Sequence, residues 1–141
     1  LKSAIRSGAE EEEKAFYGGR ASDRWLTDLE PFGTDANKPM LTDAPALIAV
    51  FGQRYGETKA ELNYYVQESV GIAVGILITA LHHAGLASLV HTPSPMNFLG
   101  DILGRPKNER PFLLIPIGFP AADCRVPDIH RKPLEEVFVS R

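Results

Sequence analysis

The sequence predicts a single α/β or α+β domain in which helices are layered around one β-sheet. The first reason is that short apolar runs typical of buried strands alternate along the chain with helical segments. The second is the length of 141 residues, which suits one compact core. The third is the apolar fraction of 44%, which is ordinary for a globular protein and argues against disorder.

The first part of the chain is expected to contain two helices, a loop and a strand. Residues 2–17 are rich in Glu and Lys and read as a helix that ends at Gly18 and Gly19. Ser22 can cap a short second helix that ends at Pro31. Residues 32–43 have the Gly, Asp, Asn and Pro content of a mobile loop. Residues 44–52, "APALIAVFG", form a compact apolar run that predicts a buried strand.

The second part is expected to contain the longest helix, over residues 59–84. Its C-terminal half is apolar on nearly every face, which predicts a central, buried position. A short strand over 86–93, a short helix over 96–104 and a buried strand over 111–119 follow. The tail, 120–141, is Pro-rich and has no obvious partner within so short a chain. We therefore expect a homodimer whose ends are exchanged between subunits.

The composition excludes several classes of protein. The net charge is −3 and acidic and basic residues are mixed, so a basic surface for nucleic acid is not expected. Cys124 is the only cysteine, which excludes an internal disulfide and suits a reducing compartment. The most apolar run, 70–81, is shorter than the roughly 20 residues that cross a bilayer, so we expect a soluble, cytoplasmic segment. Leu1 already lies in a helical pattern, which suggests the later part of a longer protein and leaves open a membrane anchor before it.

No nucleotide-binding or metal-binding motif is present in the sequence. It contains neither a G-x-G-x-x-G nor a Walker-type loop. His82 and His83 are adjacent and would point to different sides of a helix, which is poor spacing for a shared metal. His91 and His130 are isolated from any cluster of Cys or carboxylate residues. We therefore predict no metal site.

One pair of residues on the first helix suggests a binding site. Glu13 and Tyr17 are four residues apart and share a helix face. The pattern alone favours a solvated acidic face whose Tyr covers the core. The loop with Lys38 could instead close over this face, and a Glu with a Lys suits both charges of a free amino acid. Thr92, at a strand end, could point into a cleft, and Arg131 could bind a phosphate, although both are commonplace surface residues.

The chain resembles the iodotyrosine deiodinase family, a branch of the nitroreductase-like flavoproteins. The resemblance lies in the order and spacing of "EEEEKAFY", "RWLTDL", "LTDAPALIAVF", "YYVQESVGIAVG", "ALHHAGL", "LGRP" and "VPDIHRKPLEEV". It implies a nitroreductase-like α+β fold with helices around a mixed central sheet, of which residues 1–141 form the C-terminal part. It also implies a domain-swapped homodimer that holds FMN at the subunit interface, with a dimer arm at about 120–141.

The resemblance further implies the reductive removal of halide from halotyrosines such as 3-iodotyrosine, with NADPH as the ultimate electron donor. The reductase partner is unknown. A broad nitroreductase or quinone reductase of the same fold is the alternative enzyme. A non-catalytic amino-acid-binding or flavin-storage protein, or a truncated and inactive piece, is the alternative outside enzymes.

The resemblance assigns roles to specific residues. In an active-site lid at about 10–43, Glu13 would bind the ammonium of the substrate, Lys38 its carboxylate, and Tyr17 the zwitterion. Val90, His91 and Thr92 would contact the flavin, and Arg131 would bind its phosphate; these lie in the segments 90–92 and 120–141. Thr92 would hydrogen-bond the flavin N5 and favour one-electron steps, which is its catalytic role. The residue at position 91 is His where the vertebrate members carry Thr.

Overall fold

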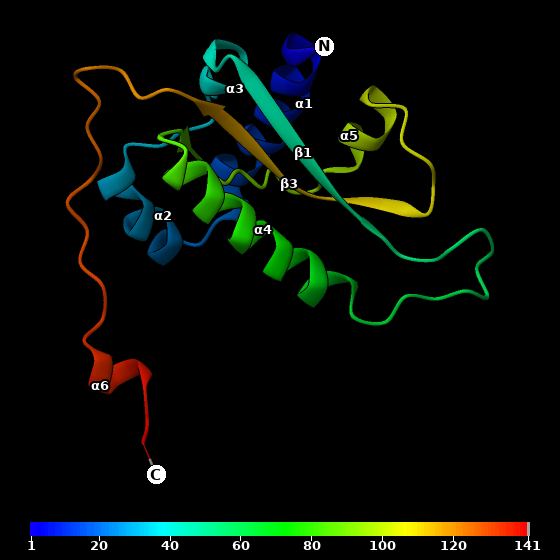
Figure 1. Cartoon of the computed structure of the whole chain (residues 1–141). Helices are drawn as coiled ribbons and strands as arrows, with labels where there is room; N and C mark the ends of the chain where they lie inside the picture. Colours follow the sequence, from blue (N-terminus) through cyan, green and yellow to red (C-terminus); the bar gives the residue numbers. More distant parts are fainter. Residues whose placement is uncertain (141) are drawn as a thin grey trace.

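The computed structural model describes residues 1–140. The helices and strands, in chain order, are α1 (Lys2–Ala15), the π-helical turn η1 (Phe16–Arg20), α2 (Asp23–Leu29), the 3₁₀ turn η2 (Glu30–Phe32), α3 (Met40–Asp43), β1 (Ala46–Gln53), α4 (Val66–His83), β2 (Ala87–Ser88), α5 (Asn97–Ile102), β3 (Glu109–Gly118) and α6 (Leu134–Val137) (Figure 1). The predicted combination of helices with one sheet, an α+β fold, is confirmed.

The sheet has the strand order β1-β3-β2. β1 pairs with β3 from Ala46 opposite Ile117 to Gln53 opposite Glu109, with one register shift between Val50 and Phe51. Both pairings are antiparallel, so the described residues do not contain the mixed sheet that the resemblance implied. The chain passes through α4, β2 and α5 before it enters β3, so the two long strands of the sheet are far apart in sequence.

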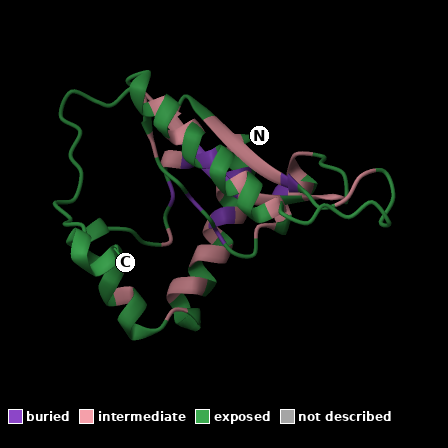
Figure 2. Cartoon of the chain, turned by 60° about the horizontal axis from the view of Figure 1, so that its bottom comes forward, coloured by how far each residue is buried: buried purple, intermediate pink, exposed green. Residues whose placement is uncertain are grey.

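The side chains of β3 point alternately to the two faces of the sheet, and helices cover both faces. Leu114, fully buried, packs with Ile5 and Ala9 of α1 and with residues of α3 and α5. Leu113 and Ile115 face the other way and pack with Val74 of α4. Figure 2 shows these buried residues concentrated between the helices and the strands. The sheet therefore separates an α1/α5 layer from an α4 layer.

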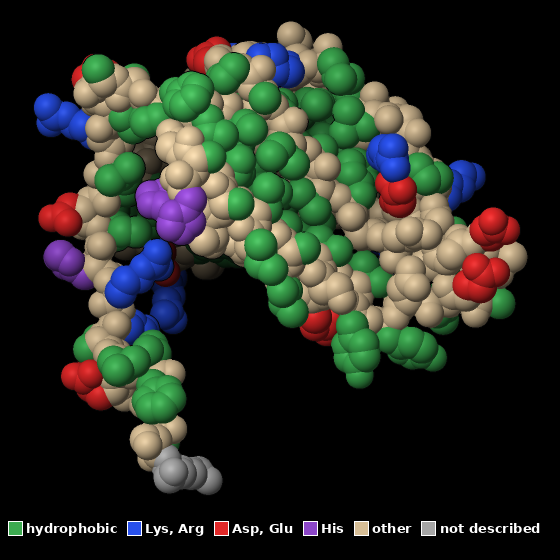
Figure 3. All heavy atoms as spheres, viewed as in Figure 1, with side chains coloured by type: hydrophobic (Ala, Val, Ile, Leu, Met, Phe, Trp, Pro, Cys, Tyr) green, Lys and Arg blue, Asp and Glu red, His purple; other side chains and the backbone are tan. Residues whose placement is uncertain are grey.

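Helix α4 differs from its prediction in two ways. It begins at Val66 rather than near residue 59, because residues 54–65 form a loop closed by a bridge between Tyr55 and Leu62. It is also not buried, since Val74 is its only buried residue whereas Ile72 and Ile76 are each 67% exposed. The sheet covers one side of the helix, and the other apolar side forms an open hydrophobic surface (Figure 3).

By length and composition alone, α4 is apolar enough to cross a membrane, with a mean hydropathy of 1.2 over 18 residues. A core helix of a folded domain meets the same criteria, and one side of α4 packs on the strands.

The predicted second strand and the tail also need correction. The strand expected over 86–93 is limited to β2, followed by a single bridge between His91 and Leu114. The tail is exposed at every described position from 119 to 140 and runs away from the domain (Figure 1). Its predicted extended form is interrupted by the short helix α6. In this chain the tail thus has little to pack against.

Candidate functional site

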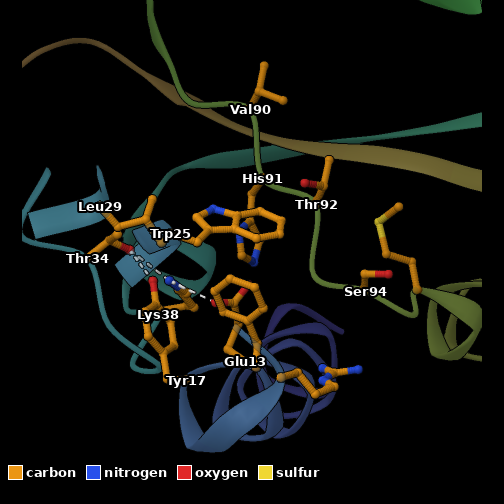
Figure 4. Close-up of a pocket in the computed structure, with 13 residues that line it drawn as sticks. Glu13, Tyr17, Trp25, Leu29, Thr34, Lys38, Val90, His91, Thr92 and Ser94 are labelled. Atoms are coloured by element: carbon orange, nitrogen blue, oxygen red, sulfur yellow. Dashed lines mark hydrogen bonds and ion pairs between the residues drawn. The ribbon is translucent and has the colours of Figure 1, made fainter. Parts of the chain in front are cut away.

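A cavity of about 640 Å³ lies between α1, the segment that follows it, and the segment 90–96 (Figure 4). Its lining includes the three expected substrate ligands and the three expected flavin contacts, which are Glu13, Tyr17, Lys38, Val90, His91 and Thr92. These residues come from parts of the sequence more than fifty positions apart. The structure therefore places the two predicted groups together, although no sequence spacing joins them.

The end of α1 brings aromatic side chains to one side of this cavity. The α-helix stops at Ala15, and the chain continues through the π-helical turn, where Gly19 has φ 144°. A residue with a Cβ rarely adopts that backbone conformation, so glycine allows the chain to turn back here. The ring of Phe16 contacts Tyr17 and Trp25 edge to face, with centroids 5.2 and 5.1 Å apart. Ser22 caps α2 as predicted, since its hydroxyl accepts from the Trp25 N–H at 3.3 Å.

Glu13 and Lys38 form an ion pair at the cavity. Lys38 Nζ lies 3.4 Å from Glu13 Oε2, and the side chains of Lys38 and Glu13 are only 4% and 12% exposed. The same ammonium donates to Thr34 Oγ1 at 2.9 Å and lies 5.4 Å from the centre of the Tyr17 ring. For Glu13, the simpler reading of a solvated acidic face is therefore wrong. The cavity presents one anion and one cation side by side.

The loop with Lys38 is fixed to α1 by hydrogen bonds that the sequence did not indicate. Glu10 Oε1 accepts from the backbone N–H of Lys38 at 2.8 Å and from Arg6 Nε at 2.7 Å. These two interactions, the bond from Lys38 first, lower the pKa of Glu10. Arg6 Nη2 also donates to Asn37 Oδ1 at 2.8 Å. The i, i+4 spacing of Arg6 and Glu10 in the sequence predicts their ion pair, whereas no pattern in the sequence predicts the contact of Lys38 with Thr34.

His91 is buried at the cavity, and its backbone is hydrogen-bonded to the central strand. Its backbone N–H and C=O both bond to Leu114, each at 2.9 Å, and the residue is 7% exposed. Among the described residues, no hydrogen-bond partner reaches its Nε2. Burial, followed by the nearby charge of Lys38, lowers the pKa of the imidazole to about 4. The ring is therefore neutral at pH 7.

The buried His91 predicts that the free energy of unfolding falls on acidification. In the unfolded chain the ring takes up a proton near pH 6.5, but in the folded chain only near pH 4. Between pH 4 and pH 6.5 the unfolded state binds more protons than the folded state. The contribution of His91 to the free energy of unfolding is therefore fully present above pH 6.5 and is lost as the pH falls towards 4. We expect a loss of roughly 2–3 kcal/mol in urea unfolding between pH 7 and pH 4.5. His91→Gln should flatten this dependence, and His130→Gln, in the exposed tail, should not.

The residues of the cavity fit the ring of a flavin better than its phosphate. Val90 and Thr92 line the cavity and are exposed, and Figure 4 shows their side chains on the other side of the segment from the ring of His91. Arg20 also lines the cavity, but it already donates to the Glu12 carbonyl oxygen at 2.6 Å. Arg131 lies in the exposed tail and does not line the cavity. Within residues 1–140, no cluster of His, Cys, Asp or Glu could hold a metal ion.

Comparison with known proteins identifies close relatives over almost the whole chain. The chain is 56% identical to an iodotyrosine deiodinase of Haliscomenobacter hydrossis over 99% of its residues, and spans 64% of that relative. It is 41% identical to human iodotyrosine deiodinase 1, again over 99% of its residues, and spans 50% of that protein. The chain thus corresponds to between half and two thirds of the length of these relatives.

Solved structures and a family model agree with these matches. A crystal structure of oxidized iodotyrosine deiodinase bound to FMN and 3-iodo-L-tyrosine superposes with a TM-score of 0.84 and 30% identity, covering 100% of this chain and 69% of that one. A nitroreductase family protein of Streptococcus pneumoniae matches with a TM-score of 0.59 over 72% of this chain and 66% of that one; at 18% identity it supports the fold alone. Residues 2–119 match the nitroreductase family model. The chain therefore belongs to the nitroreductase family.

Proposed function

We propose that the chain is the substrate-binding part of an FMN-dependent enzyme that removes halide from halotyrosines by reduction. The observation that carries the proposal is the ion pair of Glu13 and Lys38, whose side chains are 12% and 4% exposed, at a cavity that Val90 and Thr92 also line. The crystal structure of the related deiodinase, which contains both FMN and 3-iodo-L-tyrosine, supports both ligands. Reduced FMN would supply two electrons that, with one proton, convert the carbon–halogen bond to a carbon–hydrogen bond and free halide. NADPH is the proposed ultimate donor of these electrons.

The charged residues would bind the substrate by exchanging partners. Glu13 would receive the ammonium of the amino acid, and Lys38 would bind its carboxylate. One ion pair within the protein is thereby replaced by two between protein and ligand, so neither charge is left without a partner when water is excluded. Tyr17, whose hydroxyl lies 3.4 Å from Thr34 Oγ1, would hydrogen-bond the zwitterion and hold the lid closed. The aromatic ring of the substrate would then lie on the flavin that residues 90–92 contact.

The closest alternative is a nitroreductase or quinone reductase of broad specificity. Such an enzyme accepts varied flat molecules and has no use for paired charges that match a zwitterion. The burial of Lys38, 4% exposed at the side chain, favours the specific reaction. Burying an ammonium group away from water costs free energy unless the group is paired with an anion and its N–H donors are hydrogen-bonded.

The test is a titration of the full-length, FMN-loaded protein with 3-iodo-L-tyrosine while flavin fluorescence is followed. Saturable quenching, together with iodide released in proportion to oxidation of the reduced protein, would support the proposal. A flavin-loaded protein that gives no response to 3-iodotyrosine, but reduces nitroaromatics or quinones, would favour the broad reductase. Binding without any substrate-dependent oxidation would indicate a non-catalytic binding protein.

Thr92 is proposed to hydrogen-bond the flavin N5, and its removal should affect turnover more than binding. Its hydroxyl is available, because Thr92 is exposed at the cavity. Thr92→Ala should keep FMN and substrate affinity but lower the deiodination rate by about 10-fold, the effect of one lost hydrogen bond. The rate is measured from iodide release in single turnovers. Ser94→Ala, which removes a hydroxyl from the same segment, is the matched control; an equal loss in both variants would contradict the assignment.

We further infer that the protein is a homodimer. The exposed side of α4 is apolar at Ile72 and Ile76, and the tail places further apolar side chains in solvent, among them Leu134 and Phe138. A second copy of the chain would cover both surfaces, since an extended tail can pack on a neighbouring subunit. In such a dimer Arg131 would reach the FMN phosphate of the other subunit. A soluble, cytoplasmic protein fits this arrangement, in which the apolar side of α4 meets protein.

A further inference from the structure

We propose that His91 is a further substrate ligand, whose ring N–H donates a hydrogen bond to the carboxylate of the amino acid beside Lys38. The proposal rests on the proposed function and adds a specificity-determining residue to it. It gives the ring of His91 a role separate from the flavin contact expected of this segment.

The first support is the unpaired ring nitrogen. A buried polar atom without a partner is rare in folded proteins and is costly, so a buried nitrogen at a cavity indicates a partner supplied by a ligand. His91 is 93% buried, and Nε2 lacks a partner among the described residues. The ring lines the cavity, and Figure 4 shows it extending from its strand segment towards the side on which Glu13 and Lys38 lie.

The second support is that the backbone of His91 is held by the sheet. Both backbone groups of His91 bond to Leu114, which is fully buried in the central strand β3. The backbone N–H of position 91 is therefore already used. Any hydrogen bond that this residue donates to a bound molecule must come from the imidazole.

The third support is the charge of the surroundings, which selects the carboxylate. The ionisable side chains that line the cavity with His91 are Glu13, Tyr17, Arg20 and Lys38, and Lys38 is the one whose charge acts on the imidazole. The ammonium of the ligand belongs beside Glu13, so the anionic end lies beside Lys38. A neutral imidazole carries one N–H donor, which suits a carboxylate oxygen. With Lys38 it would give the carboxylate two donors.

This arrangement explains how the site would distinguish an amino acid from an amine. An iodinated phenol with an ammonium but no carboxylate would still pair with Glu13. It would leave both Lys38 and the ring of His91 without their ligand contacts. The imidazole would therefore contribute to affinity only when the carboxylate is present.

The experiment compares the affinity of the full-length, FMN-loaded protein for 3-iodo-L-tyrosine and for 3-iodotyramine, by quenching of flavin fluorescence. His91→Leu should weaken 3-iodotyrosine binding by roughly 10- to 100-fold, the range for a hydrogen bond to a charged group. The same variant should change 3-iodotyramine binding by less than about 3-fold. His91→Gln, whose side-chain amide can place a donor near the position of Nε2, should recover most of the loss for 3-iodotyrosine.

Three outcomes would separate the possibilities. Equal losses for the two ligands, or equal losses in His91→Leu and His91→Gln, would overturn the proposal, because the ring would then act only by packing. Failure of the wild-type protein to bind 3-iodotyrosine would overturn the proposed function, and this inference with it. If His91→Leu does not fold, ¹⁵N NMR of the wild-type imidazole decides: 3-iodotyrosine should shift the Nε2 resonance and 3-iodotyramine should not, and identical shifts would overturn the proposal.

Discussion

Glu13→Gln is expected to weaken the binding of 3-iodo-L-tyrosine by about 100-fold or more, the effect of leaving a buried charge without its partner. The substitution removes a charge from two interactions at once. In the free protein it takes away the carboxylate that lies 3.4 Å from Lys38 Nζ, and in the complex it takes away the partner of the ligand's ammonium. The Lys38 side chain, only 4% exposed, cannot turn to water instead.

The measurement is a fluorescence titration of the FMN-loaded variant, with the flavin content determined first. Glu11→Gln is the matched control, because Glu11 lies on the same helix, is exposed, and undergoes the same change of charge. The control should bind 3-iodotyrosine like the wild-type protein. If Glu13→Gln also binds like the wild type, the ion pair is a structural feature of the lid and the assignment of the substrate site is wrong.

Ile76→Asp is expected to convert the protein from a dimer to a monomer. Ile76 is 67% exposed in the single chain, so an aspartate there should leave the fold of one subunit intact. In the proposed dimer the same side chain is covered by the second copy, and a carboxylate would have to lose its water there without an opposite charge to pair with. The mass in solution, measured by sedimentation or light scattering, should fall by half. FMN should be lost as well if each flavin lies between the two subunits.

Asn97→Asp is the control for this change. Asn97 is exposed at the start of α5, in the layer on the other side of the sheet from α4, and the substitution adds the same charge. It should leave the mass unchanged. A dimeric Ile76→Asp variant, or a wild-type protein that is a monomer, would contradict the proposed interface.

Local signals in the sequence predicted the elements that carry Glu13 and Tyr17, whereas the roles of Lys38 and of residues 90–92 came from the family resemblance. The glycine break after α1, the cap at Ser22, and the shared face of Glu13 and Tyr17 depend on residues a few positions apart, and each is present in the structure. The bonds from Lys38 to Glu10 and Thr34 depend on how a loop folds over a helix. No periodicity encodes such a closure, so the partners of Lys38 became visible only in three dimensions.

Helix α4 shows a different limit of prediction from sequence. The apolar residues on all sides of α4 predict a helix that is covered by protein, but the pattern does not say which part of the protein covers it. One side meets the sheet, and the side with Ile72 and Ile76 meets nothing within the chain. The expectation of a central, buried helix was therefore wrong for one subunit. It stays a prediction for an assembly of two.

The pairing of Glu13 with Lys38 has a consequence for how a ligand arrives. Opposite charges this close largely cancel each other's field at long range, and Arg20, also at the cavity, is paired with Glu12. The entrance therefore neither attracts nor repels a zwitterion at long range, and the encounter rate should be nearly independent of ionic strength. Selection for an amino acid would take place after entry, when the ion pair opens. It would therefore appear as a slow dissociation rate of the bound amino acid.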